Sequence, residues 1–399
     1  MKNILIAIRS IFKKGRHNVM KIVSLGIGLA VGLVLIAKVY FEQSYDDFYP
    51  DRDRVYQVWA KYQQNGGELK DYPQTSGGIA PTMQQQIPEI ETVTRYTSFG
   101  DWTFTMTDTK MKYSGRCIIA DSCFFDILPR PMLIGNAKEV LSTPMYVLIS
   151  SRIAKNIGGD VIGKNFTVDN SPGRTMTIGG VFEEVPENSH SRYDVIVSMA
   201  SAGRFMWEGS PTNMLGNDRY ISYVKLHKGV NPLALEEQVR TFVNSYFPPE
   251  EQQKVGLSID FSFHKLDNLH KELPQVKRMT WILSLLAFAL IFTAVMNYIL
   301  IVISSIVNRS KEVAVHKCYG ASENNIHGMM FGEALVHIVL SLILALLLIL
   351  AFRGTVEELL ATSLDSLLLS NGSLVLLGIC ILVFFVSGFM PGSLYARIP

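Results

Sequence analysis

Four long apolar runs constrain the fold of this chain more than any other feature of its sequence. Each run is long enough for a helix that crosses a bilayer, which takes about 20 apolar residues. The residues between the runs have the mixed composition of a globular protein, so the 48% of apolar residues in the whole chain reflects the runs. The runs are Ile22–Phe41, Trp281–Val307, Ala334–Phe352 and Leu374–Met390. We therefore expect four membrane-spanning helices.

The distribution of lysine and arginine predicts how these helices are oriented. Residues 1–21 contain basic residues and no acidic one, and such an excess marks the cytosolic side. A cleaved signal peptide is the alternative, but Ile22–Phe41 is longer than the core of a signal peptide and no A-x-A-like cleavage site follows it. The loop 353–373 is acidic, which suits the outside, and both termini are therefore expected in the cytosol. Lys38, near the end of the first run, is expected to extend its ammonium group to the membrane surface.

Residues 42–278 form one large segment between the first two runs, and this topology places them outside the cytosol. They contain 25 Lys and Arg against 29 Asp and Glu, a net charge of −4, which is not typical of a nucleic-acid-binding protein. A segment of this length is able to bury its own hydrophobic core. We predict an α+β membrane protein with four transmembrane helices and a large two-lobed α/β extracytoplasmic domain inserted between helices 1 and 2. The expected parts are 1–41, 42–278 and 279–399, with one lobe built from 42–130 plus 220–278 and an inserted lobe at 131–219.

Local patterns predict several elements of this domain. Alternation of apolar and polar residues predicts a strand at Leu257–Leu266. Two separate strands are expected at Val93–Phe99 and Trp102–Met106. Ser150 or Ser151 is a suitable N-cap for a helix that ends at Gly158-Gly159. The charged cluster Asp46–Arg54 is expected to tie the domain to the membrane surface.

Small and polar residues within the apolar runs predict how the helices pack. The motif Gly28-x-x-x-Gly32 permits close helix contact, either within one chain or between two copies. Asn297 and His337 lie at membrane depth, where polar side chains usually face a neighbouring helix or a cavity. We expect both to form hydrogen bonds between helices.

Few residue patterns in the chain point to catalysis. Gly158–Asn165 is close to a P-loop, but its last position is Asn, no clear strand leads into it and a strand is expected after it, so we predict a turn. The eight histidines are scattered and form no metal-type pair. Cys117 and Cys123 are close enough in sequence to form a disulfide, and the sequence leaves their state open. We expect no enzyme active site, no metal and no cofactor.

The segment Asn308–Glu333 joins the second and third apolar runs and carries five charges within its first sixteen residues. Lys311–Lys317 is typical of a short amphipathic helix, and Gly320 is a plausible end for it. A second helix is expected to begin near Ser322 and to continue into the third run. We therefore predict a structured, charged elbow, the alternative being a basic loop that only joins two anchors.

The elbow and the large domain both resemble those of a known family. The run R-S-K-E-V-A-V-H-K-C-Y-G-A-S, followed by F-G-E-A, resembles the elbow of FtsX/MacB-type ABC transporter permeases, whose pattern is R-x-x-E-[IV]-[AG]-[IV]-x-[RK]-x-x-G-A. The runs Y-D-D-F-Y-P-D-R-D-R-V-Y-Q-V and V-F-E-E-V-P-E-N-S-H-S-R-Y-D are similar to the MacB-like periplasmic core domain of Bacteroidetes-type members. The resemblance implies that the elbow is a coupling helix that docks on a cytosolic ATPase. Its residues would be Arg309, Lys311, Glu312, Val313, Ala314, Val315, Lys317, Gly320, Ala321 and Glu333.

The resemblance implies a non-catalytic permease subunit of the bacterial inner membrane. A separate cytosolic ABC ATPase would bind and hydrolyse ATP, and the helices would lever the periplasmic domain (mechanotransmission) to export a peptide, drug or lipoprotein. The alternative is a membrane-tethered sensor or regulator of a periplasmic partner such as a cell-wall hydrolase. Expected partners are membrane lipid, a second permease copy or second permease half, and a periplasmic or outer-membrane protein. Relatives often continue beyond an A-R-I-P-like end, so we expect half of a longer permease or pairing with a copy of itself.

Overall fold

The structure is a computed structural model that describes residues 18–169, 171–304, 315, 318, 323–368, 372, 374–383 and 386. By its internal contacts the chain forms two units. The helical unit comprises residues 1–44 and 272–399, and the sheet unit comprises residues 45–271. The expected bounds of the extracytoplasmic domain, residues 42 and 278, stay a prediction.

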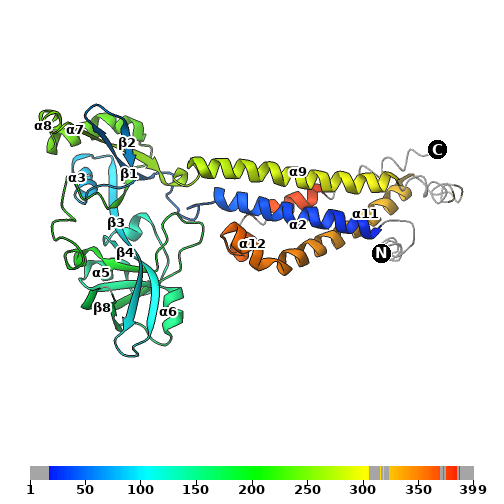
Figure 1. The fold of residues 1–399 in the computed structure, drawn as a ribbon, viewed down its shortest axis with the longest axis horizontal. Helices are drawn as coiled ribbons and strands as arrows, with labels where there is room; N and C mark the ends of the chain where they lie inside the picture. The colour runs from blue at the N-terminus through cyan, green and yellow to red at the C-terminus, as the bar shows by residue number, and fades with distance from the viewer. Residues whose placement is uncertain are drawn as a thin grey trace. The chain divides into compact units, whose positions relative to one another are not determined.

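One 11-stranded sheet runs through the sheet unit (Figure 1). Its main path is β11-β1-β10-β3-β4-β9-β6-β8-β5, with β2 beside β1 and β7 beside β3 and β8. Most neighbours are antiparallel, whereas β4 with β9 and β6 with β8 are parallel. The strands are β1 Val55–Gln64, β2 Leu69–Tyr72, β3 Ile90–Met106, β4 Lys112–Ala120, β5 Met132–Ile134, β6 Tyr146–Ser150, β7 Asn165–Val168, β8 Ser171–Phe182, β9 Val195–Ser198, β10 Ile221–Leu226 and β11 Leu257–Lys265.

Short helices connect and cover these strands. Ser150 accepts a hydrogen bond from the Ile153 backbone N–H and so caps α6, and Gly158 ends this helix with φ 75°, which confirms the predicted bounds. Asn231 caps η2 in the same way. The helices are α3 Ile79–Gln86, α4 Phe124–Ile127, α5 Ala137–Ser142, α6 Ser151–Ile157, η1 Met199–Arg204, η2 Pro232–Leu235, α7 Glu236–Tyr246, α8 Pro249–Val255 and η3 Leu266–Asn268.

Strand β3 is the element that joins the hydrophobic core clusters of the sheet unit. It contributes Val93, Tyr96 and Phe104 to three different clusters of buried side chains. The prediction of two separate strands here is wrong, because a bulge between Ser98 and Gly100, with Gly100 at φ 74°, lets one strand continue through the break. The division into two lobes stays a prediction, since one sheet connects all three clusters.

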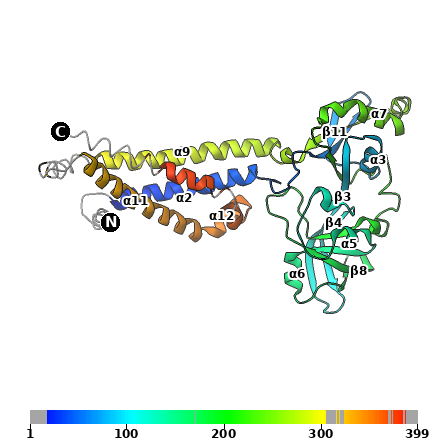
Figure 2. The ribbon, with the colours of Figure 1, turned by 180° about the vertical axis from the view of Figure 1, so that it is seen from behind.

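The helical unit contains three described helices that are long and apolar enough to cross a membrane: α2 Asn18–Gln43, α9 Pro274–Ser304 and the part Gly332–Ala351 of α11 Glu323–Ala351. Figures 1 and 2 show α2 running alongside both α9 and α11. The expected fourth span is described as a shorter apolar helix, Leu374–Val383. The count of four therefore stays a prediction. Residues 353–373 include two short helices, α12 Arg353–Leu360 and α13 Leu364–Leu368.

The glycines of α2 lie where this helix meets α9. A Cβ atom on Gly28 would overlap with the Cβ of Ala294, and one on Gly32 would overlap with the side chain of Ile291. The Gly28-x-x-x-Gly32 motif therefore packs two helices of the same chain against each other, one of the two alternatives that the sequence leaves open.

Polar groups inside the helical unit bind one another. Asn297 donates a hydrogen bond to Ser24 Oγ at 2.8 Å, and the Tyr298 hydroxyl lies 3.4 Å from His337 Nδ1, so both predicted contacts between helices are present. Lys38 also binds polar groups of this unit. Lys38 is only 7% exposed; its Nζ lies 2.6 Å from Glu42 Oε1 and donates to Thr362 Oγ1 at 2.7 Å. A carboxylate one turn away therefore binds the ammonium group, and its place at the membrane surface stays a prediction.

Candidate functional site

The predicted elbow lies mostly outside the described residues. Val315 is helical and 54% exposed, and Glu333 is buried ten residues after the start of α11. The remaining members of the predicted site lie outside the described part of the chain, and the coupling role of the elbow stays a prediction. They are Arg309, Lys311, Glu312, Val313, Ala314, Lys317, Gly320 and Ala321.

The sheet unit has its own functional candidate at the place where the chain enters and leaves it. The rings of Tyr45 and His270 stack with centroids 3.4 Å apart and planes 6° from parallel. Next to them, Lys271 Nζ lies 3.4 Å from Asp47 and 2.8 Å from Asp267. Asp47 lies on the segment that enters the unit, and Asp267 lies four residues before Lys271 on the segment that leaves it.

Arg52 completes this set of contacts. Its guanidinium lies 3.1 Å from Asp47, on the entering segment, and 3.5 Å from Asp267, on the leaving segment. The four charged groups are between 21% and 37% exposed, so the network is partly shielded from water. We call this set the clamp; it consists of Tyr45, Asp47, Arg52, Asp267, His270 and Lys271.

A second set of contacts holds Asp46, the third residue after α2. Asp46 is fully buried and adopts φ 59°, a left-handed conformation that is uncommon for a residue with a side chain. Its backbone N–H donates to the Asn188 carbonyl at 2.8 Å, and its carboxylate accepts from Ser189 Oγ at 2.9 Å and lies 2.6 Å from His190 Nδ1. These contacts hold the backbone in that conformation. We call Asp46, Asn188, Ser189 and His190 the latch.

The latch continues into buried hydroxyl groups. His190 Nε2 contacts the hydroxyl of Tyr223 and lies 3.1 Å from Ser191 Oγ, which in turn lies 2.7 Å from the hydroxyl of Tyr96. Burial raises the pKa of Tyr96 to about 12 and holds the pKa of Tyr223 well above its ordinary value. Both tyrosines therefore stay protonated at neutral pH, and the network is a structural anchor of hydrogen bonds.

The clamp and the latch account for part of the cluster Asp46–Arg54 that was expected to contact the membrane surface. The contacts that the structure shows for Asp46, Asp47 and Arg52 lie inside the sheet unit. The sequence run V-P-E-N-S-H-S-R, which provides the latch partners, has no local signal for this role, because Asp46 lies about 140 residues away in the chain.

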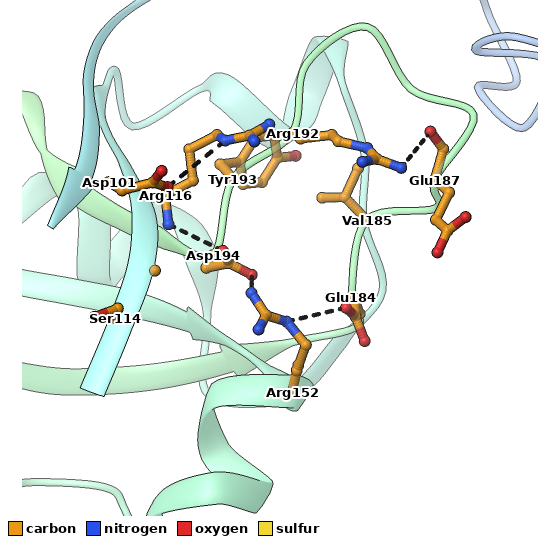
Figure 3. Close-up of a pocket in the computed structure, with 11 residues that line it drawn as sticks. Asp101, Ser114, Arg116, Arg152, Glu184, Val185, Glu187, Arg192, Tyr193 and Asp194 are labelled. Carbon is orange, nitrogen blue, oxygen red and sulfur yellow. Dashed lines mark hydrogen bonds and ion pairs between the residues drawn. The ribbon is translucent and has the colours of Figure 1, made fainter. Parts of the chain in front are cut away.

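A polar cavity of about 320 Å³ opens in another part of the sheet unit (Figure 3). Figure 3 shows Arg116 and Arg192 along one side of it and Arg152 with Glu184 along the opposite side. Arg152 binds two carboxylates at once, Glu184 at 3.2 Å and Asp194 at 2.6 Å. We call this cavity the arginine pocket; sequence reasoning missed it.

The other two arginines of the pocket have weaker partners. The guanidinium of Arg116 lies 4.0 Å from Asp101, although the backbone N–H of Arg116 donates to Asp194 at 3.0 Å. Arg192 donates one hydrogen bond, of 2.7 Å, to the backbone carbonyl of Glu187. A guanidinium has five N–H donors, so both arginines have N–H groups beyond these contacts with which to bind a ligand.

Two other sequence features are resolved by the fold. Gly158–Asn165 ends α6, turns through Gly163 at φ 77° and enters β7, so the predicted turn is confirmed and the helix that a P-loop requires is not there. Cys117 and Cys123 are free thiols, and burial raises the pKa of both. Among the described residues no group of three His, Cys, Asp or Glu side chains is placed to hold a metal ion.

Comparison with known proteins now identifies the family. Residues 20–242 match the MacB-like periplasmic core domain, and residues 284–399 match the FtsX-like permease C-terminal domain. The first match alone covers more than half of the chain. This protein is a MacB/FtsX-like permease. It is thus an ABC-transporter-type permease, embedded in a membrane, with an extracytoplasmic α/β domain; the family is generally non-catalytic and works with a cytosolic ATPase.

Two solved structures are similar to about half of the permease chain. A domain of a permease protein from Porphyromonas gingivalis is 33% identical, with a TM-score of 0.50, over 54% of this chain and 91% of that chain. The extracellular domain of the noncanonic ABC-type transporter YknZ from Gram-positive bacteria is 11% identical, with a TM-score of 0.36, over 51% of this chain and 98% of that chain. No curated protein matches the permease.

Proposed function

We propose that this permease couples ATP hydrolysis by a separate cytosolic ATPase to motion of its extracytoplasmic domain, and so exports a peptide, a drug or a lipoprotein. The observation that carries the proposal is the clamp. The segments through which the chain enters and leaves the sheet unit are bound to each other by stacked rings and by a network of four charges. A displacement of either segment therefore moves the other, and the domain responds as one body.

The proposed topology has four spans, both termini in the cytosol and residues 42–278 outside the inner membrane of a bacterium. Lysine and arginine near the spans support this orientation. Cys117 and Cys123 are proposed to lie outside, but Cys117 is buried and Cys123 is half-buried, whereas Cys318 is exposed. An introduced thiol such as Lys254→Cys on α8 is therefore the outer probe. In spheroplasts an impermeant maleimide should label Lys254→Cys, and it should label Cys318 only after permeabilisation. Labelling of Cys318 in intact spheroplasts would contradict this topology.

Coupling is proposed to run through the elbow, where Arg309, Lys311, Glu312 and Lys317 would dock on the ATPase. Ala314→Pro tests this proposal, because proline inside a helix removes a hydrogen bond and clashes with the preceding turn, at a cost of about 3 kcal/mol or more. We expect insertion and the extracytoplasmic fold to survive, and ATPase assembly or ATP-driven export to be lost. The measurement is ATP hydrolysis and export by the permease reconstituted with its ATPase.

The matched control for this experiment is Lys311→Glu, a change of charge at the same segment without a break in the backbone. Exposed charges contribute little, so we expect only a partial effect. Full assembly and export by Ala314→Pro would mean that the elbow is a connector. A second permease copy or second half would complete the transporter, and size measurement of the reconstituted complex tests that part separately.

A further inference from the structure

We propose that the arginine pocket binds a singly charged carboxylate, and that the bound carboxylate acts on the latch at Asp46. The binding step is independent of the function proposed above. The action on the latch becomes useful only if the segment after α2 transmits motion, so that second step rests on the proposed function.

The charges of the pocket determine the kind of ligand. Arg152 is matched by Glu184 and Asp194, and Asp194 is only 14% exposed and forms part of the frame of the pocket. This leaves the guanidiniums of Arg116 and Arg192 as the groups with N–H donors to spare. Guanidinium groups bind carboxylates and phosphates through paired N–H donors, so the ligand carries an oxyanion.

The acidic residues of the pocket favour a single negative charge. Asp101 and Glu187 also line the cavity, and both would repel a dianionic phosphate more than a monoanionic carboxylate. Val185 contributes an apolar wall, which suits a small apolar group next to the carboxylate of the ligand. A cavity of about 320 Å³ has room for the end of a peptide or for a small organic acid.

Arg192 links the pocket to the latch. Its guanidinium donates to the carbonyl of Glu187, and the next carbonyl along the chain, that of Asn188, accepts the backbone N–H of Asp46. A carboxylate that binds the remaining N–H groups of Arg192 fixes the position of the guanidinium that braces this loop. The same loop thus lines the pocket with Glu187 and binds Asp46, the third residue after α2, through Asn188.

The binding experiment uses the full permease in detergent micelles and isothermal titration calorimetry. The probe is N-acetyl-alanyl-alanine, which has one free carboxylate, and the matched control ligand is its C-terminal amide. We expect the amide to bind at least tenfold more weakly, and Arg192→Gln and Arg116→Gln each to weaken binding of the acid by about tenfold, since a hydrogen bond to a charged group is lost. Arg240→Gln, at an exposed position on α7, should bind as the unmodified permease does.

Further ligands identify the source of the carboxylate. Propionate that binds as tightly as the dipeptide would indicate a small organic acid, whereas weaker binding of propionate would indicate a peptide. Equal binding of acid and amide, tighter binding of inorganic phosphate, or an unchanged affinity in both arginine variants would overturn the assignment.

Coupling to the latch has its own readout, because an interaction between two sites is reciprocal. Ser189→Ala removes one hydrogen bond to Asp46 without touching the pocket, and we expect it to change the affinity for the dipeptide about threefold or more. His190→Gln is the second variant, in case Ser189→Ala perturbs the fold. An unchanged affinity in a folded variant would refute the coupling and leave the binding site intact. Because no ATPase is present, failure here is distinct from failure of the ATP-driven function.

Discussion

The two units of this permease place apolar and polar side chains in opposite positions. In the sheet unit, large side chains such as Phe182 and Phe104 are fully buried, at 0% and 1% exposure. In the helical unit, Leu285 and Phe288 are more than two thirds exposed, while Lys38 and His337 are buried. The reversed pattern tells us that the two units fold against different solvents.

Water covers the sheet unit, so burial of apolar surface stabilises it. The exposed apolar side chains of the helical unit fit a lipid surface, which gives no such driving force between helices. Close packing at glycine and hydrogen bonds between polar groups therefore have to hold the helices together. The contact of Gly28 with Ala294 and the hydrogen bond from Asn297 on α9 to Ser24 on α2 are examples of each.

One phenylalanine substitution in each unit tests whether apolar side chains are buried in the sheet unit and exposed in the helical unit, and the largest effect is expected here. Phe182→Ala should lower the free energy of unfolding of the sheet unit by about 3–5 kcal/mol, because it opens a cavity in a packed core. Phe288→Ala should change stability by about 0.5 kcal/mol or less, as substitutions on a surface do. Thermal unfolding of the detergent-solubilised permease, followed by tryptophan fluorescence and circular dichroism, compares the two. A large loss for Phe288→Ala would mean that this face packs on protein, such as a second copy.

A smaller effect is expected where the helices touch. Gly28→Ala places a methyl group where the Cβ of Ala294 already lies, so the helices have to separate, at a cost of about 1–3 kcal/mol. Gly378→Ala is the matched control, because nothing lies within 4 Å of that position. Alanine favours a helix over glycine, so the control should be neutral or slightly stabilising. Thermal unfolding in micelles measures both, and equal effects would show that close approach of α2 and α9 is unimportant.

The smallest effect concerns a surface ion pair of the sheet unit. Hydrogen bonds from Lys225, at 2.5 Å, and then Arg54 lower the pKa of Asp51 below its ordinary value of 3.8. Its contribution is therefore present at neutral pH and is lost as the pH falls below 3.8 through the lowered pKa. Asp51 is 37% exposed, and screening by solvent limits the contribution to about 0.5–1 kcal/mol.

The measurement is the melting temperature of the permease at pH 7 and at pH 3. The fall in melting temperature from pH 7 to pH 3 should be slightly smaller in Asp51→Asn than in the unmodified permease, because the asparagine has no charge to lose. Asp71→Asn, at an exposed position on β2, is the control and should leave the difference unchanged. A larger pH dependence in Asp51→Asn would mean that the pair does not stabilise the fold.

Features that depend on neighbouring residues could be predicted from the sequence. The bounds of α6 follow from Ser150 and Gly158, since a cap and a left-handed glycine act within one turn. The apolar runs predicted α2, α9 and α11 because a lipid-spanning helix needs an unbroken apolar stretch. The break at Gly100 misled the prediction, because a bulge and a strand end have the same local composition.

Features that depend on distant residues could not be predicted. The clamp joins Arg52 to Asp267, and the latch joins Asp46 to His190, across most of the sheet unit. The arginine pocket likewise combines three arginines from separate elements, and nothing in the neighbourhood of each one distinguishes it from a solvated surface charge. The elbow itself was predicted from its charges and local helix signals, whereas its coupling role came from a family pattern, and both stay predictions.

The contact between Lys38 and Thr362 has a consequence for the synthesis of the permease. The two residues are 324 positions apart, and a ribosome adds about 5–20 residues per second, so Lys38 waits roughly 16 to 65 s for this partner. Glu42 follows Lys38 by only four residues and leaves the ribosome within the same second. The ammonium group is therefore neutralised by its own helix during insertion, and the hydroxyl of Thr362 is added only after a further 324 residues have been translated.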